Sequence, residues 1–399
     1  MIIMIQGRNY YLVLYILCFI ASMVGGTVST LMSVYLPVVV RELPSDGSSD
    51  INAVSGYINA LFIYGWAIGG FTWGFISDRI GRKKALLLAI TCYGTFTLLT
   101  GLMSTWWMIS VCRIFSGFGV GGVLVVSFTL LSEVWPERSR AVFVGILSIA
   151  FPMGIFSAGL INYLLPSWRE GFMIGIVPLL VALIGSLVLQ ESESWKKQKE
   201  QGTGSATPFS NVHKRELITG SITFGSMLIG LWAIFSWLPT WVQQLSISAD
   251  AGRERGLSMM CLGVGGLTGG FFSGWLVKWL GPRKSMMVCF TVCALLSFLL
   301  FKTNNNVSGL VFAEIGILAF FFGASQGVLS SYIPQLFPTP VRATATGFCF
   351  NIGRLFTATA VLFVGLLVTV LGGFGNALYI FSLVFPLGLI STFWLKKTT

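Results

Sequence analysis

The sequence predicts an all-α membrane protein whose twelve transmembrane helices form two parallel six-helix repeats around a central cavity. An apolar composition, twelve stretches of membrane-spanning length and an internal repeat together support this prediction. Of the 399 residues, 55% are hydrophobic and only 10% are charged. Soluble proteins carry about 25% charged residues, so this chain encodes too little polar surface to cover a water-soluble globule.

Twelve apolar stretches have the length of a membrane span. A helix needs roughly 20 apolar residues to cross a hydrocarbon core of about 30 Å, and these stretches lack the apolar–polar alternation of β-barrel strands. No convincing cleavage site follows the first stretch, so we do not expect it to be removed as a signal peptide. We expect helices at 10–40, 52–76, 85–104, 107–131, 140–165, 171–190, 216–242, 255–279, 285–302, 308–333, 343–370 and 374–395.

Two blocks of residues recur about 200 positions apart. Five glycines in the second span and the loop that follows it have counterparts 200 residues later: Gly65, Gly69, Gly70, Gly74 and Gly81, then Gly265, Gly269, Gly270, Gly274 and Gly281. A second block repeats at 202: Trp135-Pro136, Arg140 and Gly145, then Phe337-Pro338, Arg342 and Gly347. Close helix packing explains the glycines individually. Six spans in each copy give the copies one orientation, with a substrate site expected near the midplane between them.

The repeat divides the chain into a six-helix half at 1–190, a cytoplasmic linker at 191–215 and a second half at 216–399. The linker combines Gly202-Thr203-Gly204-Ser205 with eight charged side chains, a composition typical of a flexible segment. His213, the only histidine, lies there and is interpreted as a solvated surface residue.

Basic residues predict the orientation. Eighteen Lys and Arg fall on one side of the spans and five on the other, with Arg113 and Arg354 inside spans. Positive residues stay on the cytoplasmic side, so both termini are expected there. The formal charge of +11 is then explained mostly by basic residues that hold the spans in this orientation. A nucleic-acid-binding role would need a basic face on a soluble domain, which the sequence lacks. Short loops favour a bacterial inner membrane, and a monomer is expected.

A charged, glycine-rich loop follows the second span: Gly74-Phe-Ile-Ser-Asp78-Arg79-Ile-Gly81-Arg82-Lys83-Lys84. Glycine permits a tight turn between packed helices, and the single acid is expected to form an ion pair. The loop resembles the signature loop of the major facilitator superfamily. Its second-half copy has Lys278 in place of the acid and Trp279 in place of the first base.

Glu133-x-x-Pro136-x-x-x-Arg140 resembles the acid-then-base motif that ends the fourth helix of sugar and organic-ion porters, and its second-half counterpart has Gln335. The resemblance implies a gate that closes the cytoplasmic side when the cavity opens outward. We assign to it Gly74, Asp78, Arg79, Gly81, Arg82, Glu133, Arg140 and Arg342.

Two arginines lie inside spans. Arg113 begins a stretch that resembles the superfamily's fourth-helix arginine motif; about 9 Å into its helix, it either anchors the helix or lines the transport route. Arg354 lies about 17 Å deep, where a charged side chain must face a cavity or a partner. Asn351 shares its helical face. We expect an anionic ligand at Arg354, with a structural partner as the alternative.

Aromatic and acidic residues complete the predicted site. Trp232 and Trp237 in the seventh span either stack on a substrate ring or pack against helices and lipid. The substrate-binding set is Arg354, Asn351, Arg113, Trp232, Trp237 and Gln326. Glu314 is the one acid clearly within the outer half of a span. It is the candidate proton-coupling group or, equally, a counter-ion to Arg113.

The stretch from Gln335 to Arg354 resembles the metabolite–proton symporter branch of the superfamily, which includes sialic acid, aromatic acid and small carboxylate transporters. Glu191-Ser-Glu193-Ser-Trp195 resembles the sequence that closes the sixth helix in that branch. The resemblance covers the whole chain at the level of architecture. It implies a secondary transporter of a small organic anion that works by alternating access, with a proton as possible co-substrate and no cofactor.

Other function classes fit less well. The main alternative is a neutral sugar porter or facilitator, in which Arg354 would be structural. A drug exporter often carries embedded acids for cations, and a receptor would usually append a soluble signalling domain. For an enzyme, the spans offer no histidine, no metal-ligand cluster and no nucleophile paired with a base. The seven cysteines all lie within spans, where they are expected to pack as small apolar residues.

Overall fold

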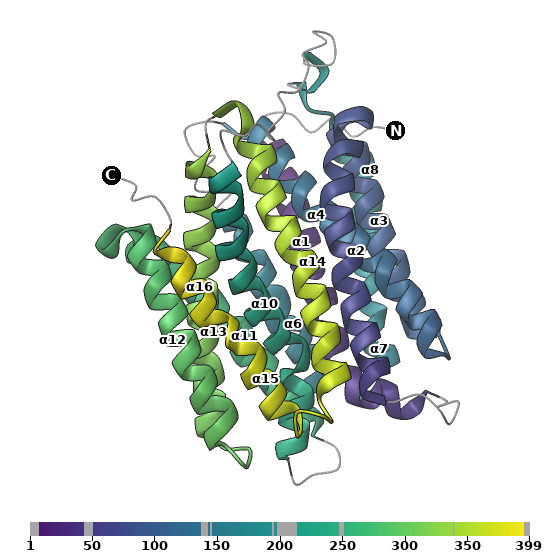
Figure 1. Cartoon of the computed structure of the whole chain (residues 1–399). Coiled ribbons are helices and arrows are strands. Elements are labelled where there is room, and N and C mark those ends of the chain that lie inside the picture. Colours follow the sequence, from purple (N-terminus) through teal and green to yellow (C-terminus); the bar gives the residue numbers. More distant parts are fainter. Residues whose placement is uncertain are drawn as a thin grey trace.

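A computed structural model describes residues 8–43, 51–136, 143, 146–193, 195–197, 214–246, 251–337 and 339–394 (Figure 1). These residues form a bundle of helices, and twelve helical segments are long and apolar enough to cross a membrane. This confirms the predicted fold class. The first three residues of the predicted fifth span, 140–142, lie outside the described residues, and the described span is Ile146–Leu164.

The first half contains α1 (Arg8–Glu42), α2 (Ile51–Ile80), α3 (Arg82–Leu102), α4 (Trp106–Val134), α6 (Ala150–Leu164), α7 (Trp168–Phe172), η1 (Met173–Gly175) and α8 (Ile176–Val188). The second half contains α10 (Lys214–Leu245), α11 (Gly252–Leu280), α12 (Pro282–Thr303), α13 (Gly309–Tyr332), η3 (Ile333–Leu336), α14 (Thr339–Leu367), α15 (Phe374–Ser382) and α16 (Val384–Thr392). The sixth span joins α7, η1 and α8, and α15 with α16 forms the twelfth.

Equivalent helices pack in the same way in both halves. In the first half α2 packs closely against α4, and α3 also contacts α4; the corresponding pairs in the second half are α11 with α13 and α12 with α13. The halves meet through another matched pair of interfaces, α2 with α14 and α6 with α11. The internal repeat of the sequence is therefore a repeat of helix packing.

The start of α1 and the end of α16 lie at the same end of the bundle, which we call the terminal side (Figure 1). The α2–α3 and α11–α12 turns also lie there, and we call the opposite end the far side. A single glycine forms each turn: Gly81, with φ of 104°, joins α2 to α3, and Gly281, with φ of 76°, joins α11 to α12. Glycine adopts positive φ without steric cost. As a result α2 runs four residues past its predicted end and carries Asp78 in its last turn.

Two glycine–glycine crossings join the halves near the far side. A Cβ atom added to Gly365 of α14 would lie 2.9 Å from Cα of Gly56 on α2. One added to Gly256 of α11 would lie 2.8 Å from the carbonyl oxygen of Gly159 on α6. Gly56 and Gly256 are themselves 200 residues apart, so the two crossings are related by the repeat. At these points the two backbones leave no room for a side chain between them.

Candidate functional site

A cavity of about 220 Å³ lies between the two halves. Its walls come from both, with Trp66 of α2 and Phe151 of α6 facing Trp232 of α10 and Arg354 of α14. The lining also includes Phe128 and Ser330, which stand close to the terminal-side ends of their helices. The cavity therefore extends from the middle of the bundle toward the terminal side, away from the glycine crossings.

Arg354 is the charged residue of this lining. Its guanidinium lies 5.1 Å from the centre of the Trp66 ring in the other half, and Nη1 donates a hydrogen bond of 2.9 Å to Oδ1 of Asn351. Among the described residues, no carboxylate lies within ion-pair distance of Arg354. A guanidinium offers five N–H donors in a planar fork. The geometry therefore leaves donors available for an anion in the cavity.

Aromatic rings from both halves surround this charge. The rings of Trp66 and Trp232 are nearly perpendicular, at 86°, with centroids 5.2 Å apart. Phe151 lies 5.5 Å from Trp66, and Phe235 lies 6.0 Å from Trp232. Such walls accept a flat apolar group, while polar atoms fix its orientation. Trp66 was missed at the sequence level, where only the glycines around it were noted.

Gln326 lines the same cavity from α13. Its Nε2 atom is buried and has no hydrogen-bond partner among the described residues. A buried amide donor without a partner is costly, so a ligand acceptor would be stabilised there. Of the predicted substrate-binding set, the structure thus brings together Arg354, Trp232 and Gln326, with Asn351 held against Arg354.

The structure places Trp237 and Arg113 away from the cavity lining. Trp237 is fully buried, stacks on Phe374 and donates from Nε1 to the carbonyl oxygen of Val361. Trp232 and Trp237 are five residues apart, which at 3.6 residues per turn puts them about 140° apart around the helix. Only one of them can face the centre.

Arg113 has a structural environment. It is 1% exposed, donates from Nη1 to the carbonyl oxygen of Val28 at 3.0 Å, and lies 3.9 Å from the centre of the Phe62 ring. Glu314 is half-buried on α13 and accepts a hydrogen bond of 2.7 Å from Nδ2 of Asn304. The two residues have separate partners, so Glu314 does not act as the counter-ion of Arg113 in this structure.

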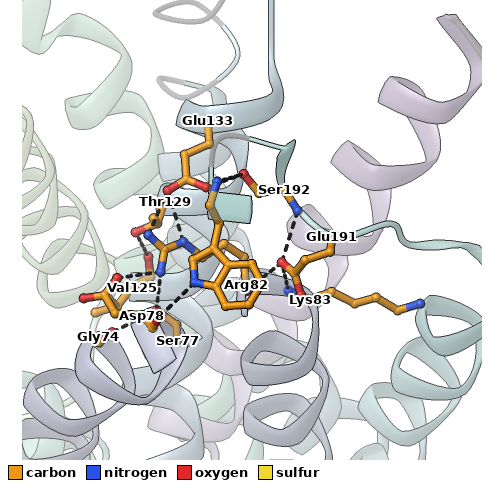
Figure 2. A network of polar contacts seen from close by, with 11 residues as sticks. Gly74, Ser77, Asp78, Arg82, Lys83, Val125, Thr129, Glu133, Glu191 and Ser192 are labelled. Atoms are coloured by element: carbon orange, nitrogen blue, oxygen red, sulfur yellow. Dashed lines mark hydrogen bonds and ion pairs between the residues drawn. The ribbon is translucent and has the colours of Figure 1, made fainter. Parts of the chain in front are cut away.

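A network of polar contacts on the terminal side centres on Arg82 (Figure 2). Its Nη1 atom lies 2.5 Å from Oδ1 of Asp78, and its Nη2 atom lies 3.0 Å from Oε1 of Glu133. Arg82 is only 5% exposed. The carboxylates of Asp78 on α2 and Glu133 on α4 therefore balance the positive charge of Arg82 at the start of α3. These three predicted gate residues lie together in the structure.

The chain that follows α8 joins this network (Figure 2). Oε1 of Glu191 accepts hydrogen bonds from the backbone N–H groups of Arg82, at 2.7 Å, and Lys83, at 3.1 Å. The first N–H groups of a helix lack partners within the helix, so this carboxylate caps α3. Ser192 donates to Oε2 of Glu133 at 2.6 Å. The sequence marked these residues only through a family resemblance and gave no sign of the capping.

The other predicted gate residues have different positions. Arg79 is exposed and lies over the ring of Phe75 at 4.0 Å. Gly74 faces α4, where an added Cβ would contact Val125 at 3.9 Å. Arg140 lies outside the described residues, and so does the side chain of Arg342, although α14 includes its backbone. The contacts shown in Figure 2 all lie within the first half and the segment that follows it.

Comparisons with known proteins agree with this architecture. Residues 14–361 match the Major Facilitator Superfamily. The chain is 28% identical to a probable 4-methylmuconolactone transporter of Cupriavidus pinatubonensis, a match that covers 82% of this chain and 78% of that protein. It is 26% identical to the cis,cis-muconate transport protein of Acinetobacter baylyi, covering 90% and 88% of the two chains.

Among solved structures, the fold is similar to that of a D-xylose–proton symporter. The TM-score is 0.80 over 96% of this chain and 97% of that one, at 16% sequence identity. The family match spans most of the chain and includes the helices that line the central cavity. The chain is therefore an integral membrane transporter, with twelve spans among the residues that the structure describes, and it belongs to the Major Facilitator Superfamily.

Proposed function

We propose that the protein is a secondary active transporter that moves a small organic anion across the membrane by alternating access. The observation that carries this proposal is Arg354, a guanidinium near mid-membrane in the cavity between the halves, beside Trp66 and without a carboxylate partner among the described residues. A charge at this depth needs a compensating group. The carboxylate of the substrate supplies it, bound by Arg354 with Asn351 beside it.

The size and walls of the cavity support a small substrate. Pockets for drug-sized ligands measure roughly 300–1,000 Å³, and this cavity of about 220 Å³ falls below that range. The aromatic rings favour a flat body, and the Nε2 atom of Gln326 offers a donor to a second polar group. One relative is named as a cis,cis-muconate transport protein and another as a probable 4-methylmuconolactone transporter.

We further propose that the terminal side faces the cytoplasm, because that side carries most of the basic residues. The glycine crossings then close the outer side, and the structure corresponds to a form whose cavity faces inward. In this form the ion pairs of Asp78, Arg82 and Glu133 stay within the first half. The gate role predicted for them would need new contacts with the second half in the outward-facing form. A monomer in a bacterial plasma membrane completes the proposal.

Thermal unfolding of the purified protein tests the substrate class. A ligand that binds only the folded state raises the melting temperature. We expect small carboxylates such as benzoate and muconate to raise it, and neutral sugars and organic cations to leave it unchanged. Benzamide, a neutral isostere of benzoate, is the matched control. A rise with sugars alone would replace the anion proposal by a sugar porter with a structural Arg354.

Glu314 remains the proposed proton-coupling group. Its carboxylate is half-buried within a span, although the cavity lining does not include it. Glu314→Gln keeps an oxygen that can accept a hydrogen bond from Asn304 but removes the carboxyl group. In proteoliposomes we expect this variant to lose uptake driven by an imposed pH gradient and to retain exchange of labelled for unlabelled substrate. Asn304→Ala removes the hydrogen bonds of Asn304 to Glu314 and to the carbonyl oxygens of Leu299 and Leu300 but keeps the carboxyl group, so it should keep both activities. Gradient-driven uptake at the normal rate in Glu314→Gln would exclude this role.

A further inference from the structure

A second cavity, of about 460 Å³, lies on the far side among the ends of α1, α6 and α11. Arginines dominate its lining: Arg41 from α1, and Arg253 and Arg255 from the first turn of α11. Only five basic residues were expected on this side of the membrane, and three of them line this one cavity. Topological anchoring would place such residues anywhere along the far-side loops, so their gathering calls for another reason.

The described lining contains one acid, Glu42. Its Oε2 atom accepts a hydrogen bond of 2.6 Å from Nε1 of Trp168, so one of its two carboxylate oxygens already has a partner. Arg255 is 2% exposed and donates to Oε1 of Gln243, whereas Arg253 is exposed and lies 5.7 Å from the centre of the Tyr163 ring. Among the described residues of this lining, three guanidinium groups accompany one carboxylate, and Arg253 forms no ion pair with a described residue.

Asn162 of α6 provides an independent observation. Its side chain lines the same cavity, is 3% exposed, and has no hydrogen-bond partner for either Nδ2 or Oδ1 among the described residues. The hydroxyl of Tyr35 lies beside this amide but gives its hydrogen to the carbonyl oxygen of Leu165, at 2.6 Å, which leaves Oδ1 of Asn162 without a donor among the described residues. A buried amide without partners is costly, and a polar ligand in the cavity would satisfy it.

We propose that this far-side cavity is a second binding site for a small carboxylate, held by Arg41, Arg253 and the amide of Asn162. Charge-assisted hydrogen bonds from arginine to carboxylate are among the strongest in proteins. Arg41 and Asn162 belong to the first half and Arg253 to the second, and the cavity adjoins the Gly159–Gly256 crossing. A bound carboxylate would therefore tie the halves together at the place where they must separate for the far side to open.

Stoichiometric binding of benzoate to the full-length purified protein tests this site. We expect two benzoates per chain for the unsubstituted protein and one for Arg354→Ala, in which only the far-side cavity remains. In that Arg354→Ala background, Arg41→Gln or Arg253→Gln should weaken the remaining binding by about tenfold or more, the loss expected for a charge-assisted hydrogen bond. Both replaced side chains are exposed, so we expect melting temperatures without ligand to be unchanged.

Lys302→Gln in the same background is the matched control. Lys302 is a basic residue of the far side that donates to Asn376 at 2.7 Å, outside the cavity lining. Its replacement should leave benzoate binding unchanged. One benzoate in the unsubstituted protein and none in Arg354→Ala would overturn the far-side site and keep the central one. One benzoate in both, lost with Arg253→Gln, would support the far-side site and exclude Arg354 as the carboxylate ligand. Binding that no arginine substitution weakens would exclude both.

Discussion

We expect Arg354→Ala to abolish uptake of the proposed small carboxylates while the protein still folds and inserts. The guanidinium is the charge that the central cavity offers an anion, and the aromatic walls that remain cannot replace it. A hydrogen bond to a charged group contributes about 1.5–3 kcal/mol, so each lost contact weakens binding by about tenfold to a hundredfold. Arg354→Lys keeps the charge without the planar fork and should retain part of the uptake.

Uptake of labelled benzoate into proteoliposomes measures this effect, and size-exclusion profiles with melting temperatures check the fold. We expect no loss of stability, because removing a deeply placed cation also removes its desolvation cost. Lys302→Ala serves as a control for the loss of one positive charge elsewhere in the protein. Uptake at the normal rate by Arg354→Ala would return this residue to the structural role that the sequence left open.

Gly365→Val should block transport by preventing the far side from closing. A Cβ at this position would meet Cα of Gly56 at 2.9 Å and the carbonyl oxygen of Asn52 at 2.7 Å, and backbone atoms cannot move aside as a side chain can. Overpacking costs about 1–3 kcal/mol, which shifts the balance between the closed and open forms about 5-fold to 150-fold. We expect the fold itself to survive, because in the proposed alternating-access cycle the halves separate at this point when the far side opens.

Thiol labelling at Asn59→Cys reports the shift. Asn59 is 3% exposed and donates to the carbonyl oxygen of Ser236 across the two halves, so a cysteine there is protected while the far side is closed. In a background without the seven native cysteines, labelling by a membrane-impermeant reagent should increase in Gly365→Val. Gly274→Val is the control, because a Cβ at Gly274 has no atom within 4 Å. Equal labelling in Gly365→Val and the control would contradict the proposed closure.

The sequence predicted the spans well because membrane insertion depends on local hydropathy and length, both of which the sequence states directly. It predicted less about which side of a helix faces the cavity. Lipid-facing and core-facing residues are both apolar in a membrane protein, so the usual contrast between an apolar and a polar face is weak. Trp66 was therefore missed. Trp237 was assigned to the same site as Trp232, although the two side chains lie about 140° apart around α10.

Contacts between segments that are distant in the sequence are the other part of the site that the sequence did not predict. The charges of Asp78, Arg82 and Glu133 suggested an ion-pair network, because unlike charges near helix ends are visible in a sequence. The capping of α3 by Glu191 depends on a carboxylate more than a hundred residues away along the chain. Neither spacing nor hydropathy encodes such a contact, so only the three-dimensional structure reveals it.

The position of Glu191 decides where the protein can be divided. The predicted linker begins at residue 191, yet Glu191 caps α3, Ser192 binds Glu133, and Nε1 of Trp195 donates to the carbonyl oxygen of Asp78. If the two halves are produced as separate polypeptides, a break at residue 190 would remove these contacts from the first half. A break after residue 197 keeps them in the first polypeptide, so reassembly of a split transporter should depend on which of the two breaks is chosen.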